Sequence, residues 1–330
     1  MNKENQLNNT LEKFNKNDNK TLLVLIGFSC NNNCIVCSVR SKRHSYLDRS
    51  YQEVAKDIKQ GRKNGFNRIE FTGGETTIRK DIIQLIAQAK KEGYQQIGIS
   101  TNGRLFSYQK FCQKIIKAGL NRITFSLFSH KAEIHNAIAR TPNSFDEIIA
   151  GIKNAQKFPG VHVNISSVIS QLNFRNLKKF GGFIHSLEIK YWYLLDLIPD
   201  GNAKTYYPKL VVKLNDLYKE LNGISNIVDD FKELGFFDFP FCLFKPELRR
   251  RKNICFINAK MRMENSQQIG YNPERLSVDK EGVYSDAYRL NIDICKKCKF
   301  YKECGGLWKD YLDLYGSKEI INLAKKNNCF

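Results

Sequence analysis

The sequence predicts an α/β fold: a partial, TIM-like (β/α)6 barrel followed by a small irregular C-terminal module. Between residues 21 and 200, short apolar runs rich in β-branched and aromatic residues alternate with longer segments of helical period, which is typical of βα units around a parallel sheet. Six such units are fewer than the eight of a closed barrel, so we expect an open one. Its active site should lie at the carboxyl ends of the strands.

The pattern places each element as follows. The predicted strands are 22–28, 68–72, 96–100, 122–127, 162–169 and 189–198. The predicted helices between them are 50–64, 80–92, 107–118, 144–157 and 173–186. These elements divide the chain into four predicted parts: a polar N-terminal tail (1–20), the barrel core (21–205), a helical connection (206–239) and a Cys-rich auxiliary-cluster module (240–330).

Composition narrows the class of protein. Hydrophobic residues make up 42% and charged residues 26% of the 330 residues, the balance of a soluble globular protein. The first twenty residues lack a signal-peptide core and no run of about 18 apolar residues follows, so we predict a cytoplasmic protein without a membrane span. The net charge of +20 favours an acidic partner such as nucleic acid, an acidic peptide or an acidic electron-transfer protein. A Lys-rich background composition explains the charge equally well, because the basic residues are spread along the chain.

Ten cysteines in a cytosolic chain indicate metal binding rather than disulfides. Three of them, Cys30, Cys34 and Cys37, have C-x3-C-x2-C spacing in a polar loop after the first predicted strand. Three thiolates on one short loop can face one iron–sulfur cubane and leave its fourth iron open to another ligand. A zinc knuckle with His44 as fourth ligand is the alternative, although zinc sites more often use C-x2-C pairs.

This cysteine motif resembles the signature of the radical S-adenosylmethionine (SAM) superfamily. The resemblance implies a [4Fe-4S] cluster that binds and reductively cleaves SAM to a 5'-deoxyadenosyl radical, which abstracts hydrogen from a substrate. It covers residues 20–205 and extends to three more strand ends. Thr72-Gly-Gly-Glu75 follows the second strand and resembles the GGE motif that contacts the methionine ammonium; glycines allow close backbone approach, and a carboxylate suits an ammonium. Ser100-Thr-Asn-Gly103 follows the third strand as in many members.

Single residues further along match the same family. The resemblance implies that Ser126, at the end of the fourth strand, approaches the ribose, and that Arg140 approaches the methionine carboxylate. The turn that starts at Ile198 resembles the one beside the adenine. Each of these also has an ordinary structural explanation, such as a polar strand end or a Pro-x-Gly turn. The expected SAM-binding residues are Gly73, Gly74, Glu75, Ser100, Asn102, Ser126, Arg140 and Ile198.

The C-terminal cysteines Cys295, Cys298 and Cys304 have C-x2-C-x5-C spacing and are followed by two glycines. They resemble the core of the SPASM and twitch modules, which hold auxiliary clusters in peptide-modifying radical SAM enzymes. The SPASM pattern continues with a Cys where this chain has Trp308, so we predict one auxiliary [4Fe-4S] cluster rather than two. Cys242 is our choice for its fourth ligand.

Other arrangements of these cysteines stay open. Cys255 is the alternative fourth ligand of the cluster, and a zinc site on the same residues is the alternative metal centre. Cys112 lies in a predicted helix and Cys329 near the chain end, so we expect neither to bind metal.

Several functions fit these features. The resemblance favours modification of a peptide or protein, with a flavodoxin or ferredoxin as electron donor. Small-molecule cofactor biosynthesis is the alternative, as in the molybdenum-cofactor enzyme, although this chain ends Asn-Asn-Cys-Phe rather than in two glycines. RNA modification has only the charge in its favour. A non-enzymatic iron–sulfur protein would need neither the GGE motif nor the STNG motif.

Overall fold

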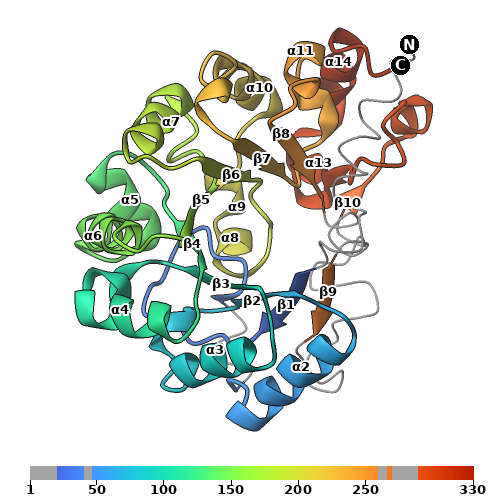
Figure 1. The fold of residues 1–330 in the computed structure, drawn as a ribbon. Coiled ribbons are helices and arrows are strands. Elements are labelled where there is room, and N and C mark those ends of the chain that lie inside the picture. The colour runs from blue at the N-terminus through green and yellow to red at the C-terminus, as the bar shows by residue number, and fades with distance from the viewer. Residues whose placement is uncertain (1–20, 41–46, 259–265, 270–288) are drawn as a thin grey trace.

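The structure, a computed structural model, describes residues 21–40, 47–258, 266–269 and 289–330, and of 266–269 the backbone only. Its centre is one nine-stranded sheet in the order β8-β7-β6-β5-β4-β3-β2-β1-β9, in which every neighbouring pair is parallel. The sheet curls into an open half-barrel with helices around its outside (Figure 1). The strands are β1 (Thr21–Leu25), β2 (Arg68–Thr72), β3 (Gln96–Thr101), β4 (Arg122–Ser126), β5 (His162–Val168), β6 (Tyr191–Leu195), β7 (Glu233–Phe237), β8 (Ile254–Ile257) and β9 (Ser266–Ile269).

Helices connect successive strands and cover the outer face of the sheet. Those of the barrel are α2 (Tyr51–Lys63), α3 (Ile82–Lys91), α4 (Gln109–Lys117), α5 (Ala132–Ala139), α6 (Ser144–Gln156) and α7 (Leu177–Ser186). Those that follow are α8 (Gly201–Thr205), α9 (Tyr207–Leu210), α10 (Leu214–Gly223), α11 (Pro246–Arg249), α13 (Lys309–Tyr315) and α14 (Lys318–Lys326). Each of the described helices is too short or too polar to cross a membrane.

The partial barrel is confirmed, and the sheet is longer than predicted. All six predicted strands form, but β7 and β8 continue the sheet beyond residue 205 and β9 pairs with its other edge. The strand β7, with the sequence Glu-Leu-Gly-Phe-Phe, was not predicted because a glycine in the middle of a strand normally weakens it. A Cβ at Gly235 would lie 2.5 Å from the ring of Tyr193 on the neighbouring strand. The glycine therefore makes room for that ring.

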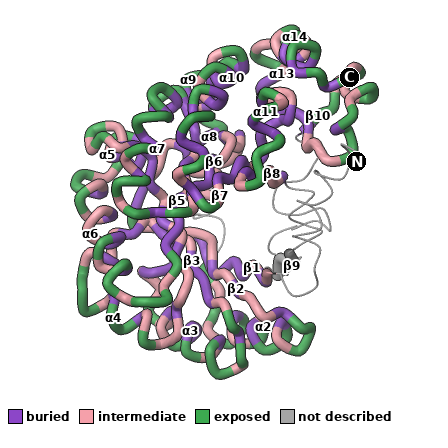
Figure 2. The backbone as a smooth tube through the Cα atoms, turned by 45° about the horizontal axis from the view of Figure 1, so that its top comes forward, coloured by how far each residue is buried: buried purple, intermediate pink, exposed green. Residues whose placement is uncertain are grey.

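The two faces of the sheet differ in polarity. In β2, Ile69 and Phe71 are buried in the hydrophobic core, whereas the alternating residues are only partly buried. Because neighbours in a strand point to opposite faces, Arg68 and Glu70 lie on the concave side. Figure 2 shows the buried positions along the strands and the exposed ones on the outer helices. Burial of the outward face holds the barrel together, and the concave face is left for polar groups.

A second, two-stranded sheet attaches the C-terminal module to the barrel. It pairs β10 (Arg289–Leu290) with β11 (Leu307–Trp308). The indole Nε1 of Trp308 donates to Oδ2 of Asp196 at 2.9 Å, directly after β6, and the guanidinium of Arg289 lies 4.2 Å from the Trp308 ring centroid. Burial raises the pKa of Asp196 to about 7, although Arg289 opposes that shift. Trp308, which stands where the SPASM pattern has a Cys, thus anchors the module to a strand end.

His135 of α5 gives the fold a pH-dependent contribution to stability. It is buried, its Nδ1 accepts a hydrogen bond from the backbone N–H of Phe128 at 3.2 Å, and burial lowers its pKa from 6.5 to about 4. The unfolded chain therefore binds a proton at higher pH than the folded chain does. We expect the free energy of unfolding to fall as pH drops from 6.5 towards 4, by up to about 1.4 kcal/mol per pH unit.

Replacing His135 by Asn tests this, because the Asn oxygen can accept the same hydrogen bond without titrating. The unfolding free energies of His135→Asn and the parent are measured in denaturant at several pH values. As pH falls from 6.5 to 4, the parent should lose more stability than the variant does. The exposed His162 supplies the control, His162→Asn. Parallel pH profiles for His135→Asn and the parent would contradict the assignment.

Candidate active site

The Cys30–Cys37 loop follows β1 at the carboxyl end of the sheet, as predicted. The three cysteines are partly buried. Desolvation raises the pKa of Cys34, and the neighbouring sulfurs of Cys37 and Cys30 raise it further, so the three thiols lie near one another. Backbone N–H groups already point at the outer two sulfurs: Asn32 donates to Cys30 Sγ at 3.4 Å, and Val39 and Arg40 donate to Cys37. Such donors stabilise thiolate ligands of a cluster, so the loop fits the predicted [4Fe-4S] site.

The two glycines of the GGE motif pack directly against the chain that leads into this loop. Gly74 N–H donates to Gly27 O at 2.9 Å, and Glu75 N–H donates to Ser29 O at 2.8 Å. A Cβ at Gly73 would lie 2.2 Å from Gly27 O, and one at Gly74 would lie 2.1 Å from Ser29 O. Gly73 also has a φ of +132°, which side chains rarely adopt. Both glycines are required for the close approach of two backbones beside the cysteines.

Glu75 is buried, and its carboxylate accepts four hydrogen bonds from the protein itself. The N–H of Thr77 (3.0 Å), the hydroxyl of Thr77 (2.5 Å) and the hydroxyl of Thr101 (2.6 Å) donate to Oε1. The N–H of Asn102 donates to Oε2 at 2.6 Å. Burial raises the pKa of Glu75 and these donors lower it. The carboxylate therefore joins the loops after β2 and β3; its contact with the methionine ammonium stays a prediction.

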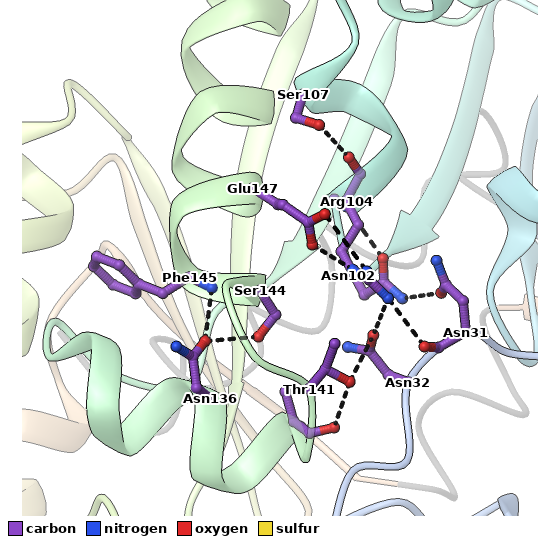
Figure 3. A network of polar contacts seen from close by, with 12 residues as sticks. Asn31, Asn32, Asn102, Arg104, Ser107, Asn136, Thr141, Ser144, Phe145 and Glu147 are labelled. Carbon is purple, nitrogen blue, oxygen red and sulfur yellow. Dashed lines mark hydrogen bonds and ion pairs between the residues drawn. The ribbon is translucent and has the colours of Figure 1, made fainter.

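Asn102 and Arg104, after β3, hold the cysteine loop from a second side (Figure 3). Asn102 Nδ2 donates to Asn31 Oδ1 at 2.7 Å. Arg104 Nη1 donates to Asn31 O at 3.0 Å and to Asn32 Oδ1 at 3.2 Å. The guanidinium is itself paired with Glu147 of α6. Arg104 is a positioning residue that the sequence analysis missed, and its place directly after the STNG motif was the available signal.

The C-terminal end of α5 approaches the loop from a third side. Ile35 N–H donates to Ile138 O at 2.8 Å and Asn33 N–H donates to Ala139 O at 3.3 Å. Arg140, the C-cap of α5, has a φ of +50° and its guanidinium lies 4.6 Å from the Tyr206 ring centroid. The structure thus brings Arg140 to the site region.

The turn after β6 completes the enclosure. Asn202 Nδ2 donates to Cys34 O at 2.8 Å and to Asn33 Oδ1 at 3.1 Å. Ala203 N–H donates to Cys37 O at 3.3 Å, and a Cβ at Gly201 would lie 2.7 Å from that same oxygen. The turn that begins at the half-buried Ile198 therefore contacts the cysteine loop directly.

The two predicted serines lie on neighbouring parts of the sheet. Ser100 belongs to β3, and its hydroxyl donates to Glu70 Oε1 at 2.8 Å on the concave face. Ser126 is the last residue of β4, pairs in register with Ser166 and is partly buried. Both positions border the concave side near the strand ends, and their contacts with SAM stay predictions.

A second group of thiols surrounds one pocket in the C-terminal module. Cys242, Cys295, Cys298 and Cys304 all line it, together with apolar residues such as Phe241. Burial raises the pKa of Cys242, and the sulfurs of the C-terminal cysteines raise it further. Within the described ranges, no three His, Cys, Asp or Glu side chains are arranged to hold a metal ion. The shared pocket nevertheless places Cys242 beside the three C-terminal cysteines, and its role as fourth ligand stays a prediction.

Of the other three cysteines, Cys255 and Cys112 do not line the C-terminal pocket, and Cys329 lies close to it. Cys255 lies on β8 beside Gly235; burial raises its pKa, and Glu233 raises it further. Cys112 is buried in α4, as expected. Cys329 was expected not to bind metal, and that stays a prediction; it belongs to a small buried cluster against which Cys242, Cys298 and Cys304 pack. The reason is that α14 brings the end of the chain back to the pocket, which local sequence does not predict.

Comparison with known proteins identifies the barrel. Residues 24–180 match the family profile described as the Radical SAM superfamily. This segment, just under half of the chain, belongs to the radical SAM superfamily. The cysteine loop of this segment supplies three thiols, the number that the predicted SAM-binding [4Fe-4S] cluster requires. SAM binding by the residues around that loop is consistent with the geometry above.

Curated relatives match part of the chain. A protein named "Probable GTP 3',8-cyclase" from Saccharolobus solfataricus is 29% identical over 183 residues, 56% of this chain and 58% of that protein. The chain thus spans little more than half the length of such curated relatives.

Solved structures share the fold over nearly the whole chain. Streptococcus suis SuiB bound to precursor peptide SuiA has a TM-score of 0.62 at 16% identity, covering 94% of this chain and 76% of that one. The structure titled "Native anSMEcpe with bound AdoMet and Cp18Cys peptide" has a TM-score of 0.58 at 16% identity, covering 93% and 97%. At these identities the comparison establishes the fold alone.

Proposed function

We propose that this radical SAM enzyme modifies a peptide or protein substrate. The observation that carries the proposal is the second thiol pocket, in which Cys242 joins Cys295, Cys298 and Cys304 beside the barrel. Two structural neighbours whose titles name a bound peptide support it through the shared fold.

In this proposal, different residues of the chain hold the cluster, position its loop, contact SAM and orient the substrate. When bound, the cluster and SAM supply reductive cleavage and a radical that abstracts hydrogen from the substrate. Cys30, Cys34 and Cys37 would hold the cluster, while Asn102, Arg104 and Asn202 keep their loop in place. We assign contacts with SAM to the GGE motif, Ser100, Asn102, Ser126, Arg140 and the turn at Ile198. The partly buried polar groups of the concave face would orient the substrate.

The C-terminal pocket would hold one auxiliary [4Fe-4S] cluster with Cys242 as fourth ligand. Cys242 lines the pocket with the three C-terminal cysteines, whereas Cys255 lies on β8. Cys329 lies behind the pocket, where Arg249 Nη1 is 3.7 Å from its Sγ. We therefore favour Cys242 over Cys329, and both over Cys255.

Iron analysis tests this ligand set. The reconstituted parent should contain about eight irons per chain if two cubanes are present. Cys242→Ala should lose about half of that iron, because its cluster would lack one protein ligand, while Cys255→Ala should keep nearly all. Loss of iron from Cys329→Ala with retention in Cys242→Ala would transfer the ligand role to Cys329. Stoichiometric zinc with only four irons in the parent would contradict an auxiliary cluster.

A nucleotide substrate is the second candidate function. It rests on the Saccharolobus relative named as a probable GTP cyclase, which matches 56% of this chain. Its support is restricted to the barrel, because that match does not extend over the whole chain.

One experiment separates the two candidates. The reconstituted enzyme is supplied with SAM, a reductant and either GTP or any short peptide that is found encoded beside its gene, and both products are analysed by mass spectrometry. A mass change in the peptide, with 5'-deoxyadenosine formed in step, would support peptide modification. Turnover of GTP without any change in the peptide would refute it.

Electrons would come from an acidic flavodoxin or ferredoxin. The net charge of +20 would speed encounter with such a protein by electrostatic steering, which salt screens. Comparing turnover with reduced flavodoxin and with a small chemical reductant over a range of salt concentrations distinguishes this role from a purely solubilising one.

A further inference from the structure

A polar pocket, which no residue of the cysteine loop lines, lies between the loops after β4 and β5. Its walls come from residues 129–131, from the first turn of α5 and from the segment that leads into α7, and its space measures about 560 Å3 including the part open to solvent. Helices α5 and α7 are neighbours in Figure 1. The pocket is lined by Ser129, His130, Lys131, Ile134, Gln171, Leu172, Asn173, Arg175, Asn176 and Phe180.

The charges around this pocket are mainly positive. Lys131 and Arg175 contribute one cation from each wall. Desolvation lowers the pKa of His130, and the nearby cations Lys131 and Lys179 lower it further, against a smaller opposing effect of Glu133. A group that lowers the pKa of a histidine in this way favours an anion at the same place.

His130 itself lacks a partner in the pocket. Its ring lies 6.2 Å from that of Phe180, centroid to centroid. Its Nδ1 is buried and has no hydrogen-bond partner among the described residues. A buried polar nitrogen without a partner costs free energy. Because this nitrogen has almost no solvent-exposed surface, the ring would turn to donate a hydrogen bond to an oxyanion in the pocket.

Two helices also begin at the pocket. Neither α5, after Lys131, nor α7, after Asn176, is capped by the side chain of its N-cap residue, although Glu220 Oε2 already accepts from the N–H of Asn176 at 3.1 Å. The N-terminal ends of helices carry partial positive charge and unpaired N–H donors, which favour phosphate. Lys131 and Arg175 add full charges to these dipoles.

The two walls are held in position by one buried residue. Asn173 Nδ2 donates to Phe128 O at 2.8 Å and to Val168 O at 2.9 Å, and its Oδ1 accepts from Ser170 N–H at 2.8 Å. The loop after β5 is thereby fastened to the loop after β4. The pocket is preformed, so binding would not require the loops to become ordered first.

From this geometry we propose that the pocket between α5 and α7 binds a phosphate group, through His130, Lys131, Arg175 and the two helix ends. The proposal goes beyond the peptide-modifying function and does not depend on it. The phosphate can be free or part of a larger ligand such as a nucleotide, and the binding chemistry is the same.

Titration of the reconstituted full chain with inorganic phosphate tests the proposal at constant ionic strength. The imidazole resonances of the five histidines are followed by NMR, and His130→Gln assigns the one that belongs to His130. Phosphate should shift the His130 resonance to saturation and raise its pKa. The double variant Lys131→Met/Arg175→Gln should weaken binding about tenfold or more, because two charge-assisted contacts are lost.

The control removes the same two charges elsewhere. Lys153 and Arg250 are exposed on α6 and after α11, and Lys153→Met/Arg250→Gln should bind phosphate as the parent does. Displacement of phosphate by GTP at His130 would support a nucleotide as the source, and no effect of GTP would support free phosphate. Equal weakening in both double variants, or a His130 resonance that phosphate does not shift, would overturn the proposal. Equal iron content in all variants verifies that each is folded.

Discussion

The triple variant Cys30→Ala/Cys34→Ala/Cys37→Ala should form no 5'-deoxyadenosine from SAM under anaerobic reducing conditions. The three thiols lie near one another on one loop, and the pKa of Cys34 is raised by Cys37 and Cys30 as well as by burial. No other described thiol reaches this loop, because the remaining cysteines lie in α4, on β8 or around the C-terminal pocket. Loss of the three thiolates therefore leaves the SAM-binding cluster without protein ligands.

Cys112→Ala is the matched control for this experiment. Cys112 is buried in α4 and away from the site, so its removal tests the effect of losing a cysteine without losing a ligand. It should leave SAM cleavage near the parent rate. The triple variant should also retain about half of the iron if the C-terminal pocket holds its own cubane. Undiminished cleavage in the triple variant would refute the cluster assignment.

Gly74→Ala should destabilise the protein by about 3–5 kcal/mol and prevent stable cluster binding. The new Cβ would lie 2.1 Å from Ser29 O and 2.6 Å from Phe28 C, and both are backbone atoms that no rotamer change can move. The estimate combines overpacking, about 1–3 kcal/mol, with two backbone hydrogen bonds at about 1 kcal/mol each. Denaturant unfolding and iron analysis measure both effects.

Gly182→Ala in α7 supplies the opposite case. A Cβ at Gly182 would meet nothing within 4 Å, and alanine favours a helix over glycine by about 1 kcal/mol. This variant should be as stable as the parent or slightly more so, with unchanged iron. If Gly74→Ala behaved in the same way, the close contact between the GGE segment and the cysteine loop would not be needed.

Local periodicity predicted the elements whose contacts are close in sequence. The strand predicted for 68–72 forms as β2 with the same limits, and α2 begins after Ser50, whose side chain accepts from Glu53 N–H while Glu53 accepts from Ser50 N–H in a capping box. The strand β7 was missed because Gly235 resembles a strand breaker until Tyr193 is beside it. The sequence pattern of a single strand does not predict which residue of the neighbouring strand will lie beside it.

The same limit applies to the site. The motif spacing predicted which strand ends would meet, and the loops after β2, β3 and β6 do contact the cysteine loop. Arg104 was missed because its partners Asn31 and Asn32 are 73 and 72 positions away in the chain. The position of Cys329 near the thiol pocket could not be predicted, because it depends on the packing of α14.

The contacts that hold the cysteine loop also determine when it can form during folding. Asn202 donates a hydrogen bond to Asn33 across 169 positions of the chain. Closing so long a loop lowers the conformational entropy of the chain before the contact can stabilise it. Contacts of high sequence separation form slowly, after local helices and neighbouring strands. The cysteine loop can therefore reach its final arrangement only after the turn at residue 202 has been synthesised and the strands up to β6 have assembled. Cluster insertion is expected to follow the folding of the barrel rather than to nucleate it.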